Sequence, residues 1–493
     1  MPPSLATLLF VVGIAGLFLL DRDRDARTSP ALWLPVVWLA LGGSRNVSQW
    51  FGAPLLTNSP DDYLDGSPLD RAILTGLIVF GVMVLVARGR RSEEVLRRNA
   101  PLLVFFLYCA ASAVWSDFPF VALKRWTKAL GNVVMILVVL TDPDPNSSVK
   151  KFFARTAFLL IPSSVLLIKY YPQLSRYYDK WEGTAYYLGV SSDKNMLGGI
   201  CLVMGLGILW RFIDVLRETV HRGRRCLVYG TVLAMNLWLL QLANSATSLG
   251  CFMLGATLIG MLSLFRRERP QIVHLMVGGI AVVGLVVYLY PDAFAFLVGS
   301  MGRNATLTGR TDLWSDLLRM DTNPLWGAGF ESFFLGDRLE YLWSKYWWHP
   351  NEAHNGYLET YLSLGGVGLC LLAWMMITGY RNALNNYRSD PRAGSLRLAF
   401  LVVAVIYNAT EAAFKVMHPV WIVFLLAITA VPELQRQEAR QRNSAQRDPD
   451  LSEFGQSSTG RDTVQWGYHL PSATDRPASN VRPLPQTARS ATD

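Results

Sequence analysis

Residues 357–379 read YLETYLSLGGVGLCLLAWMMITG and carry one charged side chain, Glu359. A hydrocarbon core of about 30 Å is crossed by about 20 mostly apolar residues in a helix, so this stretch predicts a transmembrane helix. Comparable stretches recur along most of the chain. The predicted spans are residues 5–20, 31–47, 72–87, 100–115, 128–141, 152–170, 195–213, 226–243, 247–265, 272–290, 357–379, 397–414 and 418–432. The sequence therefore predicts an all-α polytopic membrane protein with about 12–13 transmembrane helices.

The composition of the 493-residue chain agrees with this fold class. Hydrophobic residues make up 51% and charged residues 17%, whereas soluble domains carry about 25% charged residues. An ordinary soluble enzyme and a disordered scaffold are therefore excluded. The net charge of +9 does not indicate nucleic-acid binding, because the basic residues cluster between apolar stretches. The five cysteines lie in or beside apolar stretches, so neither a disulfide framework nor a zinc site is expected.

Basic residues occupy every second loop between the predicted spans. They are Arg22, Arg24, Arg27, Arg88, Arg90, Arg91, Arg97, Arg98, Lys150, Lys151, Arg217, Arg222, Arg224, Arg225, Arg266, Arg267, Arg269, Arg381, Arg388, Arg392 and Arg397. The positive-inside rule puts these loops in the cytoplasm. Thirteen spans satisfy the rule when the N-terminus is outside and the C-terminus is cytoplasmic. The first span has no basic n-region and no cleavage site, so we expect it to be a retained helix.

The spans and loops divide the chain into a polytopic membrane domain, residues 1–432, and a tail. Within the membrane domain, the outer loop 291–356 is much longer than a connection needs. Its many tryptophans, phenylalanines and tyrosines argue against disorder, so it should fold as a cap. The tail, residues 433–493, is rich in Gln, Arg, Ser, Pro, Asp and Thr. It is expected to be a disordered cytoplasmic segment.

His354 is the first candidate site residue, because it lies where the long outer loop enters span 357–379. An imidazole at such a junction can gain or lose a proton near neutral pH. Asn355 and Glu359 follow at i, i+4 spacing and share one helix face. Gly365 and Gly368 would let another helix approach closely. The alternative is that His354 and Asn355 only cap the helix.

Arg310 is the second candidate, within Gly309-Arg310-Thr311-Asp312-Leu313-Trp314. A guanidinium stays charged and can hold a diphosphate through two parallel hydrogen bonds. The alternative is a surface arginine paired with Asp312. Both alternatives place Arg310 in the outer loop.

Two further basic motifs stand at predicted outer ends of spans. Ser192-Asp193-Lys194-Asn195 precedes span 195–213, where free N–H groups of a helix start can cap or bind an anion. Lys194 and Asn195 are therefore candidates. Residues 124–128 read KRWTK and break the positive-inside pattern, so Arg125 and Lys128 would attract a lipid-linked diphosphate. Helix capping for the first motif and snorkelling to ordinary headgroups for the second are the alternatives.

Asn408 and Glu411 complete the candidates. They lie at i, i+3 spacing in the predicted span 397–414, where an ionisable side chain indicates function unless it serves a buried structural hydrogen bond. The predicted topology places all these motifs toward the outer face. A site there with cations, aromatic rings, one histidine and one glutamate suits a sugar carried on a lipid diphosphate. His354 or Glu411 would act as general base, and fixed cations would stabilise the leaving group without a metal.

These motifs resemble the O-antigen ligase/polymerase superfamily. The resemblance rests on His354-Asn355-x9-Gly365-x2-Gly368, on Gly309-Arg310 through Trp314, and on the many spans. Ser192 through Gly198, Trp115-Ser116-Asp117 and Asn408-Ala409-Thr410-Glu411 resemble its exopolysaccharide-polymerase branch.

The resemblance implies a C-type glycosyltransferase-like fold with a helical periplasmic cap in the bacterial inner membrane. It also implies glycan transfer from undecaprenyl diphosphate to an acceptor hydroxyl, with no metal or cofactor. His354 would activate the acceptor and Arg310 would clamp the diphosphate. A second essential arginine of the ligases has no clear match, although Lys194 or Arg125 could replace it. A Ser-Arg-Thr stretch of the superfamily appears as Ser245-Ala246-Thr247, without its arginine.

The expected reaction is polymerisation of exopolysaccharide or O-antigen repeat units. The alternatives are ligation of the glycan to lipid A–core and a polysaccharide transporter or flippase. The expected partners are the undecaprenyl-diphosphate-linked glycan, an acceptor glycan or glycolipid and membrane lipids, with no nucleic acid. Polysaccharide export and chain-length proteins are further candidate partners.

Overall fold

A computed structural model describes residues 1–22, 28–53, 64, 66–178, 185–219, 221–264, 271, 273–279 and 308–431. Within these residues the fold is helical apart from one antiparallel pair of three-residue strands, β1 (Arg176–Tyr178) and β2 (Ala185–Tyr187). The α-helices are α1 (Pro3–Leu20), α2 (Trp33–Gly43), α3 (Val47–Trp50), α5 (Pro68–Arg88), α6 (Arg90–Arg98), α7 (Ala100–Ala111), α8 (Pro119–Leu140), α9 (Pro145–Tyr170), α10 (Pro172–Ser175), α11 (Lys194–Val215), α12 (Arg222–Ala243), α13 (Ala246–Leu264), α16 (Thr308–Arg319), α17 (Gly336–Lys345), α18 (Gly356–Ser389), α19 (Pro391–Tyr407) and α20 (Pro419–Ile428). The 3-10 turns are η1 (Pro30–Leu32) and η2 (Ser112–Trp115).

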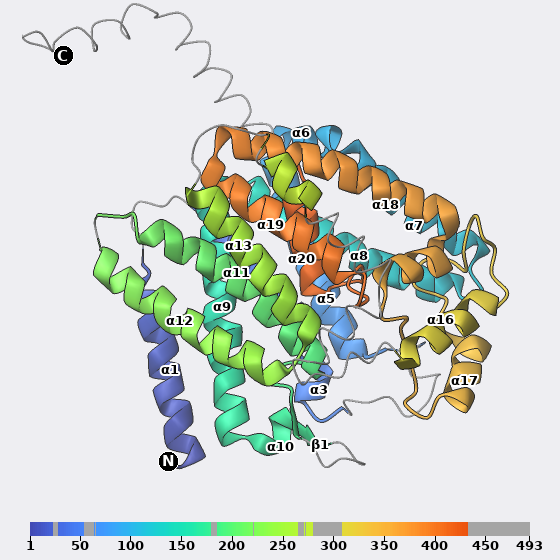
Figure 1. Ribbon diagram of the computed structural model, residues 1–493, viewed down its shortest axis with the longest axis horizontal. Coiled ribbons are helices and arrows are strands. Elements are labelled where there is room, and N and C mark those ends of the chain that lie inside the picture. The colour runs from blue at the N-terminus through green and yellow to red at the C-terminus, as the bar shows by residue number, and fades with distance from the viewer. Residues whose placement is uncertain are drawn as a thin grey trace, which may run out of the picture. The chain divides into compact units, whose positions relative to one another are not determined.

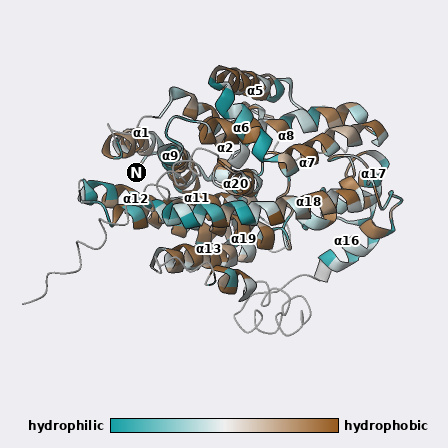
Figure 2. Cartoon of the chain, turned by 90° about the horizontal axis from the view of Figure 1, so that it is seen from above, coloured by the Kyte–Doolittle hydropathy of each residue, from teal (hydrophilic) through white to brown (hydrophobic). Residues whose placement is uncertain are grey.

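The helices form a bundle with a buried centre and an apolar periphery. Nearly all of α20 and most of α11 are buried, whereas α1 and α5 leave most of their apolar side chains exposed. Figure 2 shows hydrophobic colouring along α1, α5 and α13 and hydrophilic colouring on α6. An apolar helix that faces outward is stable when lipid surrounds it. This pattern confirms the all-α polytopic membrane fold.

The number of helices that can cross a membrane is smaller than predicted. By length and composition seven described helices qualify, or eight if the pair Arg90–Arg98 and Ala100–Trp115, bent by 84°, is one span. Helices α2 and α20 are apolar but have only 11 and 10 residues. Most of predicted span 272–290 lies outside the described residues. Each other predicted span coincides wholly or partly with a helix, so the count of 12–13 differs because several helices are short or carry charge.

Helix α18 is broken at Gly365, which has φ 65° and ψ −166° inside an otherwise helical stretch. The break exposes main-chain N–H groups, and the loop before α17 supplies their acceptors. Gly366 N donates to Pro324 O at 2.8 Å, and Val367 N donates to Leu325 O at 3.2 Å. The prediction that Gly365 and Gly368 admit a second helix is wrong. Loop backbone fills the space at Gly365, and Gly368 faces Leu364 of its own helix.

Gly365→Ala should destabilise the protein strongly. A side chain is strained at this positive φ, at a cost of about 1–3 kcal/mol, and its Cβ would overlap the backbone of Leu325. Gly366→Ala is the matched control, because its Cβ would meet only Pro324 O, at 3.6 Å. We expect a lower melting temperature in detergent for the first variant only. Equal melting of the two variants would contradict the break.

Helices α16 and α17 lie together at the edge of the bundle (Figures 1 and 2). With the loops around them they form a small core of their own, whose buried side chains are Leu313, Leu317, Ala328, Phe333, Leu342, Ala353 and Leu362. We call residues 308–355 the cap. The described part of the predicted outer loop is therefore folded. Residues 291–307 and the tail 433–493 lie outside the described residues, so the prediction of a disordered tail stays a prediction.

Candidate functional site

His354 lies in the loop that enters α18, and the cap fixes the backbone of this loop. Trp314 Nε1 donates to Ala353 O at 2.7 Å, and Ala353 N donates to Glu359 Oε1 at 2.9 Å. His354 itself has φ 49°, a left-handed conformation that is uncommon outside glycine. Asn355 then caps α18, since its side-chain oxygen accepts from Tyr357 N and Leu358 N. The local contacts thus set the direction of the imidazole.

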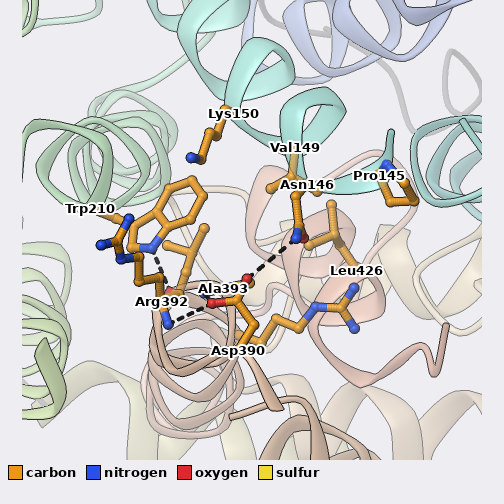
Figure 3. Close-up of a pocket in the computed structure, with 11 residues that line it drawn as sticks. Pro145, Asn146, Val149, Lys150, Trp210, Asp390, Arg392, Ala393 and Leu426 are labelled. Atoms are coloured by element: carbon orange, nitrogen blue, oxygen red, sulfur yellow. Dashed lines mark hydrogen bonds between the residues drawn. The ribbon is translucent and has the colours of Figure 1, made fainter. Parts of the chain in front are cut away.

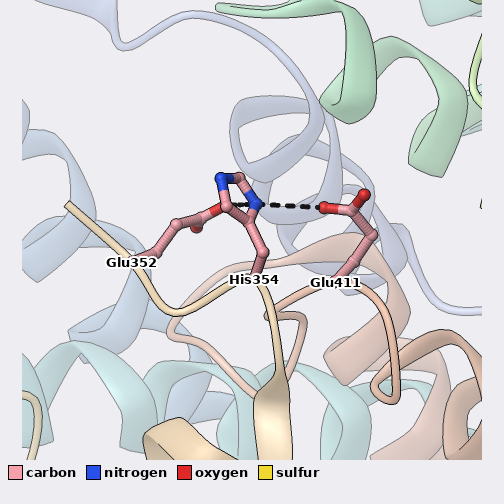
Figure 4. A group of neighbouring side chains, drawn as sticks. All are labelled: Glu352, His354 and Glu411. Carbon is pink, nitrogen blue, oxygen red and sulfur yellow. Dashed lines mark ion pairs between the residues drawn. The ribbon is translucent and has the colours of Figure 1, made fainter. Parts of the chain in front are cut away.

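The His354 ring lies between two carboxylates (Figure 4). Its Nδ1 is 2.8 Å from Glu352 Oε1 and 3.4 Å from Glu411 Oε2, so one ring nitrogen makes both contacts. Trp348 stacks on the ring with centroids 6.2 Å apart. Burial would lower the pKa of His354, but the two carboxylates outweigh burial and raise the pKa to about 9. The resting side chain is therefore an imidazolium at neutral pH.

Glu411 reaches His354 from the connection between α19 and α20. Residues 408–411 are not part of a transmembrane helix, which corrects the predicted span 397–414, because α19 ends at Tyr407. Asn408 Oδ1 accepts from Ala413 N and Phe414 N, which turns the chain. Asn408 O also accepts from Gly356 N at 2.9 Å. Asn408 therefore positions the Glu411 loop against the start of α18 and does not face the imidazole.

Arg310 of α16 joins the same cluster. Its Nη2 lies 3.3 Å from Glu411 Oε1, and its Nη1 donates to Thr410 O. Arg310 thus lies beside Glu411, which in turn lies beside His354, whereas no ion pair to Asp312 is found among the described residues. Thr410 Oγ1 is also 2.9 Å from Thr247 Oγ1, which brings the Ser245-Ala246-Thr247 stretch to the same place.

Sequence reasoning missed two members of the cluster, Glu352 and Lys415. Lys415 Nζ lies 2.6 Å from Glu352 Oε2 and 3.4 Å from Glu359 Oε1. Burial would raise the pKa of Glu352, but Lys415 and then His354 hold it well below its usual range. The two residues are 63 positions apart, so no local pattern links them. A cue did exist, since Lys415 directly follows an apolar stretch and Glu352 is close to His354 in sequence.

These contacts make one charge network of three acidic and three basic side chains. Its members are Glu352, Glu359, Glu411, His354, Lys415 and Arg310. Each carboxylate of the network has Lys415 or Arg310 within 3.4 Å. An additional anion would therefore need further cations.

Arg125 and Lys128 supply such cations in a neighbouring pocket of about 300 Å³. The network members Glu359 and Lys415 also line this pocket, which we call the aromatic pocket. Its apolar wall consists of Phe105, Phe106, Phe330, Phe333, Phe334, Phe414 and Trp421. Arg125 donates to Glu331 O, and Glu331 Oε1 accepts from Val416 N at 3.1 Å. Lys128 has no ion pair with any described residue.

Lys194 and Asn195 stand at the first turn of α11, at the same end of the bundle. Asp193 caps this helix, because its Oδ1 accepts from Met196 N at 2.8 Å. Lys194 Nζ lies 4.0 Å from the centre of the Tyr186 ring. Neither Lys194 nor Asn195 contacts the network directly in the part of the chain that is described.

Glu352, His354 and Glu411 offer donor atoms within 4.8 Å of one another, as a metal site would require. Their surroundings fit a metal ion poorly, because Lys415 pairs with Glu352 and Arg310 pairs with Glu411. A divalent ion would add two positive charges beside these cations. The carboxylates are therefore better suited to orienting the imidazole.

A pocket of about 310 Å³ lies at the opposite end of the bundle, where α9 and α19 begin (Figure 3). Its cations Lys150 and Arg392 both pair with the buried carboxylate of Asp214, at 2.7 and 3.1 Å. Trp210 Nε1 donates to Arg392 O, and Asn146 Nδ2 donates to Asp390 Oδ2. These polar groups satisfy one another and tie the helix ends together. None of the predicted site residues lies here.

Comparison with known proteins identifies two similarities. Residues 230–373, which include Arg310 and His354, match the family described as O-Antigen ligase. The chain is also similar to the exopolysaccharide production protein ExoQ of Rhizobium meliloti (strain 1021). The two are 26% identical over 344 residues, which cover 67% of this chain and 75% of the relative. Both similarities agree with the resemblance of the motifs to the O-antigen ligase/polymerase superfamily.

Proposed function

We propose that this chain transfers a glycan from a polyprenyl-diphosphate-linked oligosaccharide to a sugar hydroxyl, and thereby polymerises exopolysaccharide repeat units. The similarities to the O-Antigen ligase family and to ExoQ support a multi-pass membrane protein with a polysaccharide-related, glycan-transferring function. The finer assignment is supported by one observation above all. His354, Glu411 and Arg310 meet at one end of the bundle, beside a pocket with two more cations and an aromatic wall.

The reaction needs a general base, cations that stabilise the diphosphate, and an apolar surface for the lipid. The acceptor oxygen forms a bond to the anomeric carbon while the bond from that carbon to the diphosphate oxygen breaks. The hydroxyl proton passes to Nε2 of His354, the ring nitrogen that does not pair with the carboxylates, and the diphosphate keeps the bonding electrons. Glu352 and Glu411 stabilise the resulting imidazolium, as a buried carboxylate does in a His–carboxylate pair. Arg310, Arg125 and Lys128 stabilise the diphosphate, with Lys194 as a further cation at the same end.

The outer face is part of the proposal. The site lies at the start of α18 and α11. The other end of the bundle holds a second group of ion pairs, in which Asp142 and Asp214 pair with Arg88, Lys150, Arg211 and Arg392. The positive-inside rule favours a cytoplasmic location for that second end. The site would then be periplasmic in an inner membrane, with the N-terminus on the same side.

Transfer activity should rise with pH. The raised pKa of His354, about 9, means that the neutral base is scarce at pH 7, so kcat/KM should increase until it levels near pH 9. Glu352→Gln removes a carboxylate that favours the protonated ring. The midpoint should therefore move to lower pH. A rate that falls over the same range would instead assign His354 as an acid or an anion clamp.

Reconstitution tests the function itself. Purified full-length protein in vesicles should extend an undecaprenyl-diphosphate oligosaccharide into lipid-linked polymers, with equal yield in the presence of a chelator. Loss of activity with chelator would overturn metal independence. Ligation is the second candidate, because the matching family is described as O-Antigen ligase. Transfer only when lipid A–core is added would establish ligation, and transbilayer movement of the lipid without transfer would establish a transporter.

A further inference from the structure

A second cavity, of about 430 Å³, lies between the cap and residues 115–117, and the proposed reaction does not use it. It is lined by two tryptophans and several polar side chains, and we call it the tryptophan cavity. The residues that matter here are Trp115, Asp117, Asp321, Asn323, Trp326 and Arg338. Trp115 and Asp117 belong to one of the motifs that resemble the exopolysaccharide-polymerase branch, and the proposed reaction gives them no role. The volume is within the range of small-molecule sites, about 300–1,000 Å³.

The two indoles are held in place and yet remain open to solvent. Trp115 is 38% and Trp326 46% exposed. Trp115 Nε1 donates to Trp326 O at 3.2 Å, and the ring centroids are 6.1 Å apart at an angle of 61°. Asn323 Oδ1 accepts from Trp326 N at 3.1 Å, which fixes the turn that carries this indole. Rigid aromatic surface of this kind loses little entropy when a ligand stacks on it.

The polar groups of the cavity select the ligand. Arg338 Nη1 is 2.8 Å from Asp117 Oδ2, so this pair is neutral overall. Asp321 has no ion pair with a described residue and adds a negative charge. A phosphate or another anion would be repelled. An uncharged sugar ring has apolar C–H faces for the indoles and hydroxyl groups that can donate to the carboxylates.

One short loop connects this cavity with the aromatic pocket. Gly327 and Ala328 line the tryptophan cavity, whereas Phe330 and Glu331 line the aromatic pocket. The loop is fixed to α18, because Ala328 N donates to Leu362 O and Gly329 N donates to Ser363 O, both at 2.9 Å. A glycan whose diphosphate lies in the aromatic pocket would reach the tryptophans by passing this loop.

We propose that the tryptophan cavity binds an uncharged sugar residue of the glycan, at a distance from the reacting hydroxyl. The proposal rests on the proposed function and deepens it, because it gives the enzyme a second binding site for the polysaccharide. Such a site would keep a growing chain bound between successive transfers. The products should therefore be longer than a single reaction site alone would give.

Titration with a soluble saccharide tests this proposal. The probe is an oligosaccharide released by partial acid hydrolysis from the polysaccharide of the source strain, added to full-length protein in nanodiscs. Trp326→Ala should weaken binding about tenfold, as expected for the loss of one aromatic contact of about 1.4 kcal/mol. Asp321→Asn, which leaves the packing intact, should weaken it a few-fold. Trp347→Ala is the matched control, since Trp347 is 74% exposed in the same cap but does not line the cavity.

The outcomes separate this proposal from the proposed function. If the unaltered protein makes polymer while Trp326→Ala and Asp321→Asn keep full affinity and product length, the cavity proposal fails and the function stands. If binding depends on Trp326 but no glycan is transferred, the function fails and the cavity stands. A lower melting temperature for Trp326→Ala with unchanged affinity would make the tryptophans a membrane anchor and overturn the proposal.

Discussion

His354→Ala should lower kcat/KM for glycan transfer by about 10²–10⁴-fold, the usual contribution of a general base. The variant removes the only ring that contacts both Glu352 and Glu411 in the described structure. Alanine leaves two carboxylates without their shared cation, but Lys415 and Arg310 still pair with them. The fold should therefore survive, and loss of activity should not reflect loss of protein. Initial rates of lipid-linked polymer formation in vesicles measure the effect.

His349→Ala is the matched control for this prediction. His349 lies in the same cap and also has a positive φ, of 48°, but it stacks on Trp343 with ring centroids 4.6 Å apart and is exposed. Its loss should leave the rate nearly unchanged. Full activity of the His354 variant at an equal protein level would remove the imidazole from the mechanism.

Arg310→Gln should lower kcat/KM by about 10²–10³-fold, the typical cost of losing one group that stabilises charge in the transition state. Arg310→Lys should recover only part of the activity, because an ammonium cannot contact Thr410 O and Glu411 with the same planar fork. Arg319→Gln on the same helix is the control, since Arg319 is exposed and remote from the network. Rates at several donor concentrations would show whether binding or turnover suffers.

A double mutant separates two roles of Arg310. If Arg310 acts only by positioning Glu411, the variant carrying Arg310→Gln and Glu411→Gln should be no worse than the poorer single variant. If Arg310 also stabilises the diphosphate, the double variant should be worse than either. Additive losses with equal melting temperatures would support the clamp. An Arg310→Gln variant with full activity would contradict both roles.

The helical architecture could be predicted because apolar length is a local signal. Residues 357–379 and 195–213 are apolar over nearly their whole length, and α18 and α11 include both ranges. The break at Gly365 could not be predicted in the same way. A glycine in an apolar stretch looks the same whether it packs against a helix or adopts a positive φ. Only the distant loop at Pro324 and Leu325 decides between these conformations.

The main charged residues of the candidate site could be predicted from the sequence, but the contacts that connect them could not. His354, Arg310 and Glu411 stood out as polar groups near predicted membrane boundaries, and the structure brings them together. Asn408 was placed in a helix because the surrounding residues are apolar. Its side chain instead accepts from two main-chain N–H groups further along, a local competition that ends the helix. Lys415 could not be predicted as a site residue, because its partners Glu352 and Glu359 are far away in the sequence.

The main-chain hydrogen bonds between the cap and α18 have a consequence for how such proteins diversify. Pro324 and Leu325 hold the broken helix through their carbonyl oxygens, and Ala328 and Gly329 hold it through their amides. Every residue type can offer a carbonyl oxygen, so exchanging the side chains of residues 324–326 leaves these attachments intact, whereas Gly327 and Gly329 have positive φ and no room for a Cβ. Substitutions near Trp326 could thus change which sugar is bound, while the residues around His354 keep their positions.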